Sequence, residues 1–432
     1  MLFFMKIIQV HDYFRDSTGV VTDSRKLTQD CFFIALRGQN FDGNQFAEVA
    51  IEKGAKYALV DRPEIAQKNK RLILVKDTLQ CLQELAQYHR KKLKTKIIGL
   101  TGSNGKTTTK ELNNSVLAKK FNTKATQGNF NNHIGVPLTL LNFDENTEIG
   151  IVEMGANHQK EIDFLCKLAQ PELGLITNFG QAHLEGFGGI NGVIKGKSEI
   201  YEYLSLNGGT LILNIDDPIQ RKWMSYSPHY TFGEHSDANC NLKYLRRKSK
   251  PLALKIEDET IESQIHGEYN FSNIGAAVAV GKFFGLSKLQ IQLGISSYKS
   301  INNRSQSTEK GNNKIILDAY NANPSSMESS INAFIYNLKN RGVVILGDMF
   351  ELGSFTQQAH QKIIEQLESS GIKRILVVGE HFFRTQSNDP RVIRFESLEK
   401  IKKFLKQNTI ENSEILIKGS RGMTMEILVD SL

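Results

Sequence analysis

The sequence predicts an α/β protein of three domains, in which a small α/β module precedes two larger domains built on open sheets. The length of 432 residues exceeds what one ordinary hydrophobic core organises, so several domains are expected. From Lys96 onward, short apolar runs alternate with helical stretches, a pattern typical of parallel sheets that helices cover on both faces. We therefore expect domains at residues 1–94, 95–301 and 302–432.

The first domain has the pattern of short strands with one or two helices. Its apolar strand candidates are Ala55–Val60 and Leu72–Val75. Leu79–Leu93 then has the spacing of an amphipathic helix. The basic residues that end this helix, up to Lys94, mark the first domain boundary.

The second and third domains each contain a series of apolar runs of strand length. In the second domain these runs are Ile97–Leu100, Ile149–Val152, Leu173–Ile176 and Thr210–Leu213. Ser272–Phe284 is predicted to be a small-residue helix, and the polar Ser297–Arg304 marks the second boundary. In the third domain, whose rhythm is Rossmann-like, the runs are Lys314–Leu317, Val343–Leu346, Arg374–Val378 and Glu414–Ile417.

The composition is that of a folded globular protein, with 40% hydrophobic residues, 23% charged residues and eight prolines. A net charge of +8 would suit an anionic partner, but Lys and Arg are spread along the chain. The densest basic cluster, Arg246–Lys248, is short. We interpret it as a solvated basic face rather than a nucleic-acid site, and we expect no nucleic-acid partner.

Cysteine spacing and hydropathy indicate the compartment. The four cysteines lie far apart and form no C-x-x-C pair, which predicts neither a zinc site nor disulfides and fits a reducing cytoplasm. Every apolar run falls short of a membrane span. The opening Met1–Met5 lacks the basic region and cleavage site of a signal peptide, and Met5 could equally be the start.

A glycine-bearing loop between a strand and a helix is the strongest local signal. It reads Gly-Leu-Thr-Gly-Ser-Asn-Gly-Lys-Thr-Thr-Thr over Gly99–Thr109. Backbone N–H groups of such a loop bind phosphate oxygens, the Lys adds charge, and a hydroxyl suits Mg²⁺. The usual pattern has Gly where Leu100 stands, so this is a variant, and an ordinary structural turn is the alternative. The residues predicted to hold the nucleotide phosphates are Gly102, Ser103, Asn104, Gly105, Lys106, Thr107 and Thr108.

Two further polar residues follow apolar strands. Glu153 ends one strand, where an unpaired buried charge would be costly. Ligands gather beyond the carboxyl ends of strands in open sheets, so we prefer a Mg²⁺ ligand to a capping or surface Glu. His183 follows another strand, and a lone His of this kind is more often structural than a ligand.

The loop sequence Thr-Gly-Ser-Asn-Gly-Lys-Thr-Thr resembles the nucleotide loop of the Mur ligases and of their folylpolyglutamate synthetase relatives. Gln127–Thr139 is similar to the family segment that lies against the UDP-sugar, and Gly267–Ala277 to the segment in which an Asn faces adenine. Arg304 and Asp318–Met327 resemble the part of the last domain that closes over ATP.

The first domain resembles the uridine-binding module of the same family. The matching segments are Thr22–Arg25, Phe32–Gly38 and Phe41–Phe46. The family commonly has His where Asn44 stands, so no role is assigned to that position.

Other segments resemble the branch of the family that adds D-alanyl-D-alanine. They are Ala182–Phe187, Leu346–Gly353 with the following His360, and Lys418–Arg421. The Asp-Asn-Pro-Arg string of the diaminopimelate-adding relative does not occur in the chain. The resemblance therefore implies that ATP phosphorylates the terminal carboxylate of a UDP-N-acetylmuramoyl-tripeptide, and that the amine of D-alanyl-D-alanine attacks the acyl phosphate.

The resemblance also implies roles for individual residues. The catalytic residues would be Lys106, Glu153, His183 and Lys197. Mg²⁺ would be held by Thr107, Glu153, His183 and Lys197. ATP would also contact Asn270, Asn273, Arg304 and Asp318. The other substrates would be bound by Ser24, Arg25, Asn131, Asn132, Lys418 and Arg421.

Lys197 lies on the apolar row of a predicted helix, Gly192–Leu204, together with Val193, Ile200 and Leu204. Burial there would favour a neutral amine, which can react with carbon dioxide to form a carbamate that suits Mg²⁺. A lysine that extends its ammonium group to water is the alternative. The similarity of Gly196–Tyr201 to the family segment with the modified lysine favours carbamylation.

Two rival functions stay open at this point. One is a related amide ligase that adds a single amino acid, and the other is a nucleotide switch that makes no bond. The sequence does not specify lysine or diaminopimelate at position three of the peptide, the source organism, the oligomeric state or the domain arrangement. We expect a cytoplasmic monomer that serves peptidoglycan synthesis, and hence cell shape and division.

Overall fold

The structure, a computed structural model, describes residues 5–226, 228–248, 250–300 and 303–432. The possible start at Met1 and the domain boundary predicted between residues 301 and 302 lie outside the described residues. Within these residues, no helix combines the length and the apolar character needed to cross a membrane.

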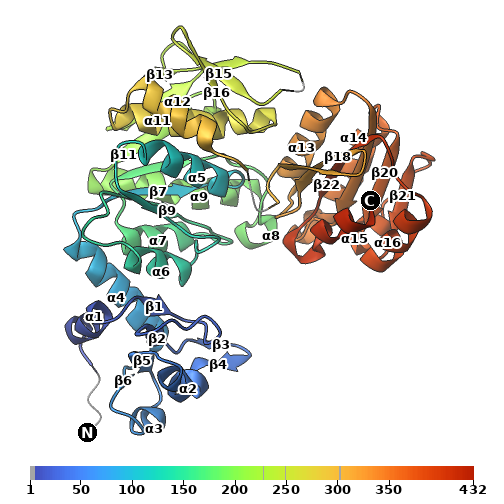
Figure 1. Cartoon of the computed structure of the whole chain (residues 1–432). Helices are drawn as coiled ribbons and strands as arrows, with labels where there is room; N and C mark the ends of the chain where they lie inside the picture. The colour runs from blue at the N-terminus through green and yellow to red at the C-terminus, as the bar shows by residue number, and fades with distance from the viewer. Residues whose placement is uncertain (1–4, 227, 249, 301–302) are drawn as a thin grey trace. The chain divides into compact units, whose positions relative to one another are not determined.

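The chain divides into two compact units. The first takes in the chain up to Leu100, then Phe121–Gly155 and Ile162–Gly174. The second comprises Thr101–Lys120, Ala156–Glu161 and Leu175–Leu432. The α/β class predicted from the sequence is confirmed, since strands of parallel sheets alternate with helices along the chain in both units (Figure 1).

The first unit begins with a parallel sheet of order β1-β2-β5-β6. Its strands are β1 (Val20–Val21), β2 (Phe32–Ile34), β5 (Tyr57–Val60) and β6 (Leu72–Leu74). The helices here are α1 (Ile7–Arg15), α2 (Ala47–Glu52), α3 (Pro63–Ala66) and α4 (Thr78–Lys92). A hairpin of β3 (Arg37–Gly38) and β4 (Phe41–Asp42) leads into η1 (Gly43–Phe46). The prediction of one or two helices up to about Lys94 was wrong, because the short helices α1, α2 and α3 precede α4.

The central sheet has the order β13-β12-β11-β10-β7-β9-β8. Its strands are β7 (Lys96–Thr101), β8 (Thr123–Ala125), β9 (Ile149–Glu153), β10 (Leu173–Ile176), β11 (Thr210–Asn214), β12 (His229–Gly233) and β13 (Cys240–Asn241). Helices of this region are α5 (Lys106–Leu117), α6 (Gly135–Leu141), α7 (Glu161–Ala169), α8 (Leu184–Phe187), α9 (Ile190–Asn207) and α10 (Pro218–Arg221), with η2 (Lys222–Ser225). Each predicted strand is present because its apolar run is buried along almost its whole length.

A small antiparallel sheet follows, which the sequence did not predict. It consists of β14 (Lys243–Leu245), β15 (Ala253–Ile256) and β16 (Glu259–Glu262). The next elements are η3 (Glu268–Asn270), α11 (Phe271–Phe283) and α12 (Lys288–Ser297). The predicted small-residue helix is thus α11, and its alanines and glycines are buried.

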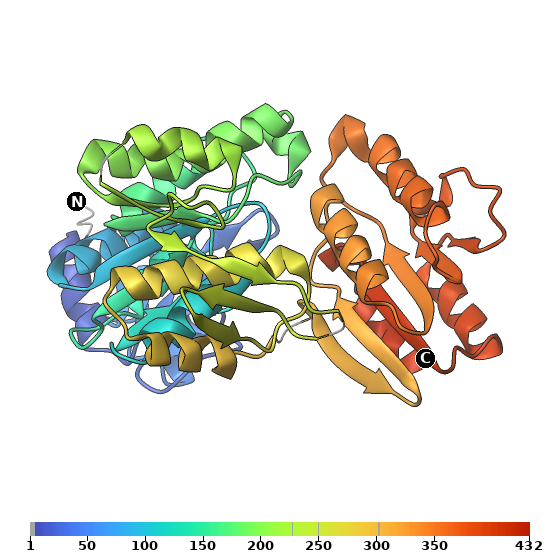
Figure 2. The same ribbon diagram turned by 90° about the horizontal axis from the view of Figure 1, so that it is seen from above.

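The last sheet has the order β17-β18-β22-β19-β20-β21, parallel except for the edge strand β17. Its strands are β17 (Gln306–Lys310), β18 (Asn313–Asp318), β19 (Arg341–Gly347), β20 (Arg374–Val378), β21 (Val392–Phe395) and β22 (Ser413–Lys418). Its helices are α13 (Pro324–Asn337), α14 (Thr356–Glu368), α15 (Glu380–Phe383) and α16 (Leu398–Gln407), with η4 (Gly353–Phe355), η5 (Arg421–Met423) and η6 (Met425–Ser431). Helices lie on both sides of the sheet (Figure 1 and Figure 2), and one face packs on α16 and η6.

A buried histidine pair joins α1 to α4 in the first unit. His11 Nε2 lies 3.1 Å from His89 Nδ1, and His89 Nε2 lies 2.9 Å from the carbonyl oxygen of Phe143. Since a carbonyl only accepts, His89 donates through Nε2 and accepts through Nδ1, and His11 donates to it. Burial, with the nearby His89 and Arg15, lowers the pKa of His11 to about 4, and burial lowers the pKa of His89.

We expect the first unit to lose stability in mild acid. A His whose pKa is lower in the folded state binds a proton more readily when the chain is unfolded. The free energy of unfolding is therefore unaffected by protonation of His11 above about pH 6.5 and decreases as the pH drops toward 4. For His11 the loss at pH 5 relative to pH 7.5 is roughly 1 to 2 kcal/mol. Hydrogen exchange of α1 and α4 amides at the two pH values measures it.

The His11→Gln variant keeps a donor for His89 but cannot titrate, so the pH-dependent loss should shrink. His133→Gln, at an exposed position, serves as the matched control and should behave like the wild type. If the wild type and His11→Gln lost equal stability between pH 7.5 and pH 5, protonation of His11 would not be the cause of the loss.

Candidate functional site

The predicted phosphate loop connects β7 to α5, and two glycines allow its path. Gly102 has a φ of +142°, and a Cβ there would lie 1.9 Å from Thr177 Oγ1. Gly105 has a φ of +79°, and its Cβ would lie 2.5 Å from Asn273 Oδ1. Side chains are excluded at both positions by sterics and by backbone conformation, so the loop needs glycine there.

Residues at the end of β10 brace this loop, and sequence reasoning assigned them no role. Thr177 Oγ1 donates to the carbonyl oxygen of Asn104 at 2.6 Å, and Asn104 N–H donates to Asn178 Oδ1 at 3.1 Å. Ser103 Oγ donates to the Gly180 carbonyl at 2.7 Å. The sequence signal that could have identified them is the polar pair Thr177 and Asn178 directly after the buried strand β10. Loops at this end of the strands bind ligands in open sheets.

Lys106 begins α5 and lies over the loop itself. Its Nζ donates to the carbonyl oxygens of Gly102 at 2.8 Å and Ser103 at 3.3 Å. Thr107 is half-buried beside it, and Thr108 is buried. One charged side chain, Lys106, and two hydroxyls thus lie at the helix N-terminus that follows a loop of the kind that binds phosphate.

The two asparagines predicted to contact ATP lie behind the loop. Thr109 Oγ1 donates to Asn273 Oδ1 at 3.1 Å, and Asn273 Nδ2 donates to Asn270 Oδ1 at 2.8 Å. Asn270 Nδ2 donates in turn to the His266 carbonyl at 2.8 Å. This chain of amides links the start of α11 to α5.

Glu153 is 1% exposed at the end of β9, which rules out a surface glutamate. Asn131 Nδ2 donates to its Oε1 at 2.9 Å, and the Asn131 carbonyl accepts from Gly155 N–H. Asn132 instead accepts from the N–H groups of Ile134 and Gly135 at the start of α6, at 3.1 and 2.9 Å. Asn131 thus orients the carboxylate, and Asn132 accepts from backbone N–H groups at the start of α6.

Lys197 is 1% exposed, so the alternative in which its ammonium reaches water is wrong. Its Nζ donates to the Ala156 carbonyl at 3.0 Å and lies 4.9 Å from the ring centroid of Phe187. Burial, together with the positive charge of Lys106, lowers the pKa of Lys197 well below its usual value. Its row companions Val193, Ile200 and Leu204 are buried as well.

His183 precedes α8 in a left-handed conformation, with a φ of +54°. Its Nδ1 lies 2.5 Å from Oε2 of Glu351, which follows β19. This contact with His183 lowers the pKa of Glu351, although partial burial opposes the shift. Glu351 lies in the Leu346–Gly353 segment that resembles the family, but its sequence pattern does not single out this carboxylate.

Asp318 and Lys418, predicted to meet different ligands, form one ion pair. Lys418 Nζ lies 2.6 Å from Asp318 Oδ2, and both side chains are largely buried. Ser330 Oγ and Ser305 N–H also donate to Asp318, at 2.8 and 3.0 Å. Burial opposes ionisation of Asp318, but Lys418 and these donors bring its pKa below the usual value.

Arg304 and Arg421 lie on the ring of Tyr320. The Arg304 guanidinium carbon lies 3.5 Å from the ring centroid and that of Arg421 lies 6.0 Å away. Arg421 also bonds to Glu426 at 2.7 Å. Tyr320 was not predicted as a site residue. Its ring nevertheless contacts both Arg304, which was predicted to bind ATP, and Arg421, which was predicted to bind the dipeptide.

The N-terminus of α13 touches the phosphate loop. Asn323 Nδ2 donates to Asn104 Oδ1 at 2.7 Å, and Gln181 N–H donates to Ser325 Oγ at 2.8 Å. The Asn-Pro-Ser-Ser stretch is the helix entry that its sequence predicted, with Asn323 as the capping residue. The residues that begin α13 are therefore also the ones that contact the phosphate loop and the segment after β10.

In the first unit, the predicted uridine-binding residues lie on the surface. Arg25 is 86% exposed and pairs with Asp23 at 2.9 Å, next to the half-buried Ser24. Asn44 is buried and donates to Asp42 and Asp61 at 2.8 and 2.9 Å. Its position is structural, in keeping with the absence of an assigned role.

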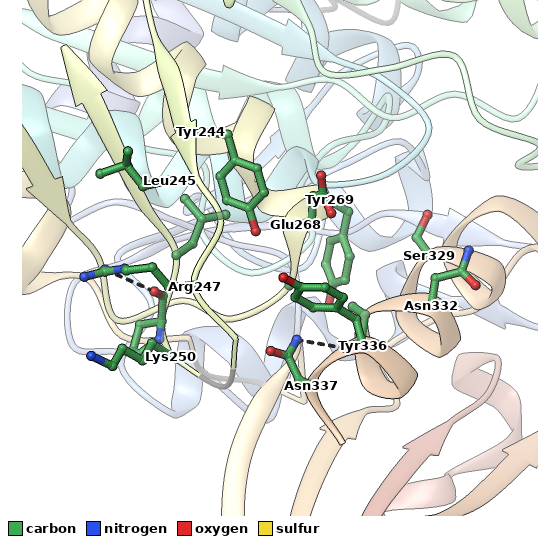
Figure 3. A pocket seen from close by; sticks show the side chains of 14 residues that line it. Tyr244, Leu245, Arg247, Lys250, Glu268, Tyr269, Ser329, Asn332, Tyr336 and Asn337 are labelled. Carbon is green, nitrogen blue, oxygen red and sulfur yellow. Dashed lines mark hydrogen bonds between the residues drawn. The ribbon is translucent and has the colours of Figure 1, made fainter. Parts of the chain in front are cut away.

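Figure 3 shows a separate pocket of about 450 Å³ in the second unit. Three tyrosines, Tyr244, Tyr269 and Tyr336, line it from β14, η3 and α13. None of the described residues that line it belongs to the predicted nucleotide set. The pocket is thus distinct in composition from the phosphate loop.

The predicted metal ligands suit a hard cation by their chemistry. Glu153 supplies a buried carboxylate and Thr107 a hydroxyl, and oxygen donors of this kind are preferred by Mg²⁺. Lys197 fits only as a carbamate, since an ammonium would repel the ion. The described residues contain no cluster of three or more His, Cys, Asp or Glu side chains that could hold a metal ion.

Comparison with family models covers three stretches of the chain. Residues 16–90 match the Mur ligase family catalytic domain, and residues 100–281 match the Mur ligase middle domain. Residues 303–421 match the Mur ligase glutamate ligase domain.

Individual proteins are similar over nearly the whole chain. UDP-N-acetylmuramoyl-tripeptide–D-alanyl-D-alanine ligase of Bacillus subtilis is 36% identical, covering 96% of this chain and 93% of its own length. The crystal structure of MurF from Acinetobacter baumannii superposes with a TM-score of 0.87 at 29% identity, covering 99% of this chain and 98% of the other. MurF ligase from Thermotoga maritima in complex with ADP superposes with a TM-score of 0.83 at 28% identity, covering 96% of each chain.

Proposed function

Since the chain belongs to the Mur ligase family, as its sequence resemblance predicted, we propose that it is the ATP-dependent ligase that joins D-alanyl-D-alanine to UDP-N-acetylmuramoyl-tripeptide. The observation that carries this proposal is the similarity to the Bacillus subtilis ligase of that name over 96% of the chain. The ADP bound to the Thermotoga maritima relative supports ATP as the nucleotide.

In the proposed reaction, the γ-phosphoryl group moves from ATP to the terminal carboxylate of the tripeptide. The dipeptide amine then attacks the acyl phosphate and releases phosphate. Positioning and charge neutralisation dominate such chemistry, so the loop Gly102–Thr108 holds the phosphates and Lys106 offsets their charge. Asn270, Asn273, Arg304 and Asp318 would orient the rest of the nucleotide.

Mg²⁺, held by Thr107, Glu153, His183 and carbamylated Lys197, would neutralise charge on the transferring group. The burial of Glu153 at the end of β9, and the hydrogen bond from Lys197 to Ala156 three residues later, support this assignment. Asn131, which orients Glu153, and Asn132 would lie toward the UDP-sugar, and Ser24 with Arg25 would bind the uridine end.

The remaining expectations belong to the same proposal. Residues 1–94 would bind the UDP-sugar, residues 95–301 ATP, and residues 302–432 the dipeptide. We propose a cytoplasmic monomer that acts in peptidoglycan precursor synthesis. The four cysteines are buried thiols, which is compatible with a reducing compartment.

The proposal is tested by supplying ATP and Mg²⁺ with each UDP-tripeptide, containing lysine or diaminopimelate, and with D-alanyl-D-alanine or single amino acids. We expect ADP release that requires both the tripeptide and the dipeptide. Efficient use of a single amino acid would support the rival amide ligase. Nucleotide hydrolysis independent of both substrates would support a switch.

Arg421 is proposed to select the amine, so Arg421→Ala should raise the KM for D-alanyl-D-alanine by about tenfold and leave that for ATP nearly unchanged. Lys418→Ala should also weaken dipeptide use. Because it removes the ion-pair partner of the buried Asp318, it should lower the free energy of unfolding by about 3–5 kcal/mol. Substrate titrations and urea unfolding measure the two effects. Arg384→Ala, an exposed arginine of the same domain, is the control, and a loss confined to ATP would refute the assignment.

A further inference from the structure

The loop that follows β19 is held in place by buried side chains. Met349 N–H donates to His360 Nε2 at 3.0 Å, and Phe350 N–H donates to Ser420 Oγ at 2.9 Å. His360 Nδ1 lies 2.7 Å from the Thr356 carbonyl, so it donates there and leaves Nε2 to accept. The backbone of the loop Asp348–Gly353 is therefore fixed by hydrogen bonds at Met349 and Phe350, immediately before Glu351.

Glu351 projects from this anchored loop toward His183. Its φ of +61° lies in the left-handed region, and its carbonyl accepts from Glu185 N–H at 3.3 Å. A Cβ at Gly353 would lie 3.2 Å from the Glu185 side chain, so the two segments are in close contact. The backbone is thus held on both sides of the 2.5 Å contact between Glu351 Oε2 and His183 Nδ1.

The contact dictates where the imidazole carries its proton. A carboxylate only accepts, so His183 Nδ1 must be the protonated nitrogen. Nδ1 is buried, and among the described residues it has no well-formed hydrogen bond, so the close ion-pair contact with Glu351 Oε2 is what places a carboxylate against this nitrogen. In the neutral ring, Nε2 then keeps its lone pair, which is the form that binds a cation.

We propose that Glu351 is a positioning residue that fixes the tautomer and orientation of His183. This inference rests on the proposed function for its catalytic consequence. The Leu346–Gly353 segment, His360 and Ser420 would then serve as the scaffold that presents this carboxylate. His183 is itself in the left-handed region, a conformation that a non-glycine residue keeps only where its surroundings enforce it.

The tautomer is measured without nucleotide or metal, by long-range ¹H–¹⁵N spectra of protein labelled in histidine, with His183→Gln to assign the signal. We expect a protonated Nδ1 in the wild type and a protonated Nε2 in Glu351→Ala. Glu328→Ala, an exposed carboxylate on α13, should match the wild type. A protonated Nε2 in the wild type, or an unchanged tautomer in Glu351→Ala, would overturn the proposal.

Kinetics provide the second readout. We expect Glu351→Ala to lower kcat about 10- to 100-fold with little change in the KM for D-alanyl-D-alanine. Glu351→Gln should recover most of the activity, because its amide oxygen still accepts from Nδ1. In a His183→Gln background the Glu351→Ala change should have no further effect, and additive losses would contradict a role through His183. If the wild type makes no dipeptide product, the proposed function fails, while the tautomer experiment still decides the role of Glu351.

Discussion

Lys106→Ala is expected to abolish ligation, with a loss in kcat of at least about 100- to 1,000-fold. The side chain lies over the phosphate loop, where its Nζ donates to the carbonyl oxygens of Gly102 and Ser103, so its charge lies beside the loop that would hold the phosphates. Removing that charge leaves the transferring phosphoryl group poorly neutralised, since the protein contributes mainly positioning and electrostatics to such a reaction.

The measurement is ADP release with all substrates present, alongside the circular dichroism and unfolding midpoint of each variant. We expect the fold of Lys106→Ala to be unchanged, because the lysine is not part of a hydrophobic core. Lys119→Ala, an exposed lysine just beyond the end of α5, is the matched control and should turn over normally. Wild-type turnover in Lys106→Ala would refute the role of this residue.

Lys197 is expected to be carbamylated in the active enzyme, and Lys197→Ala to lose nearly all activity. Its Nζ is buried beside Phe187, with the Ala156 carbonyl as acceptor, and its lowered pKa favours the neutral amine that reacts with carbon dioxide. The product is an anion with oxygen donors, which would suit Mg²⁺ and remove a buried positive charge. The expected loss is again about 100-fold or more, the scale for a group that stabilises developing charge.

The modification is detected by a carbamate signal in ¹³C spectra after exposure to ¹³C-bicarbonate, and by electron density with Mg²⁺ and nucleotide near neutral pH. Lys195→Ala, two residues earlier and exposed, is the control and should keep both the signal and the activity. A short carboxylic acid such as acetate should partly restore Lys197→Ala. An unmodified Nζ, together with full activity of Lys197→Ala in bicarbonate-free buffer, would contradict the prediction.

The strands β7, β9, β10, β11, β18, β19, β20 and β22 and the glycine-bearing loop after β7 were predictable because their signals are local, whereas β8, β12, β13, β17 and β21 were not predicted. A buried strand needs an unbroken apolar run, and a phosphate loop needs glycines at fixed offsets before a Lys. The row of Val193, Lys197, Ile200 and Leu204 is local in the same sense, since it depends only on helix periodicity. The short α1–α3 and the antiparallel β14–β16 were missed because a few residues carry too little periodicity to identify an element.

The sequence by itself thus determined the class of fold, the order of the long apolar strands, the glycine-bearing loop between β7 and α5, and the family to which the chain belongs. Only the tertiary structure decided that Lys418 pairs with Asp318, that Arg304 and Arg421 share the ring of Tyr320, and that Glu351 meets His183. The physical reason is that these partners lie far apart along the chain. A hydrogen bond or ion pair is specified by distance and direction, and folding alone brings such groups within reach.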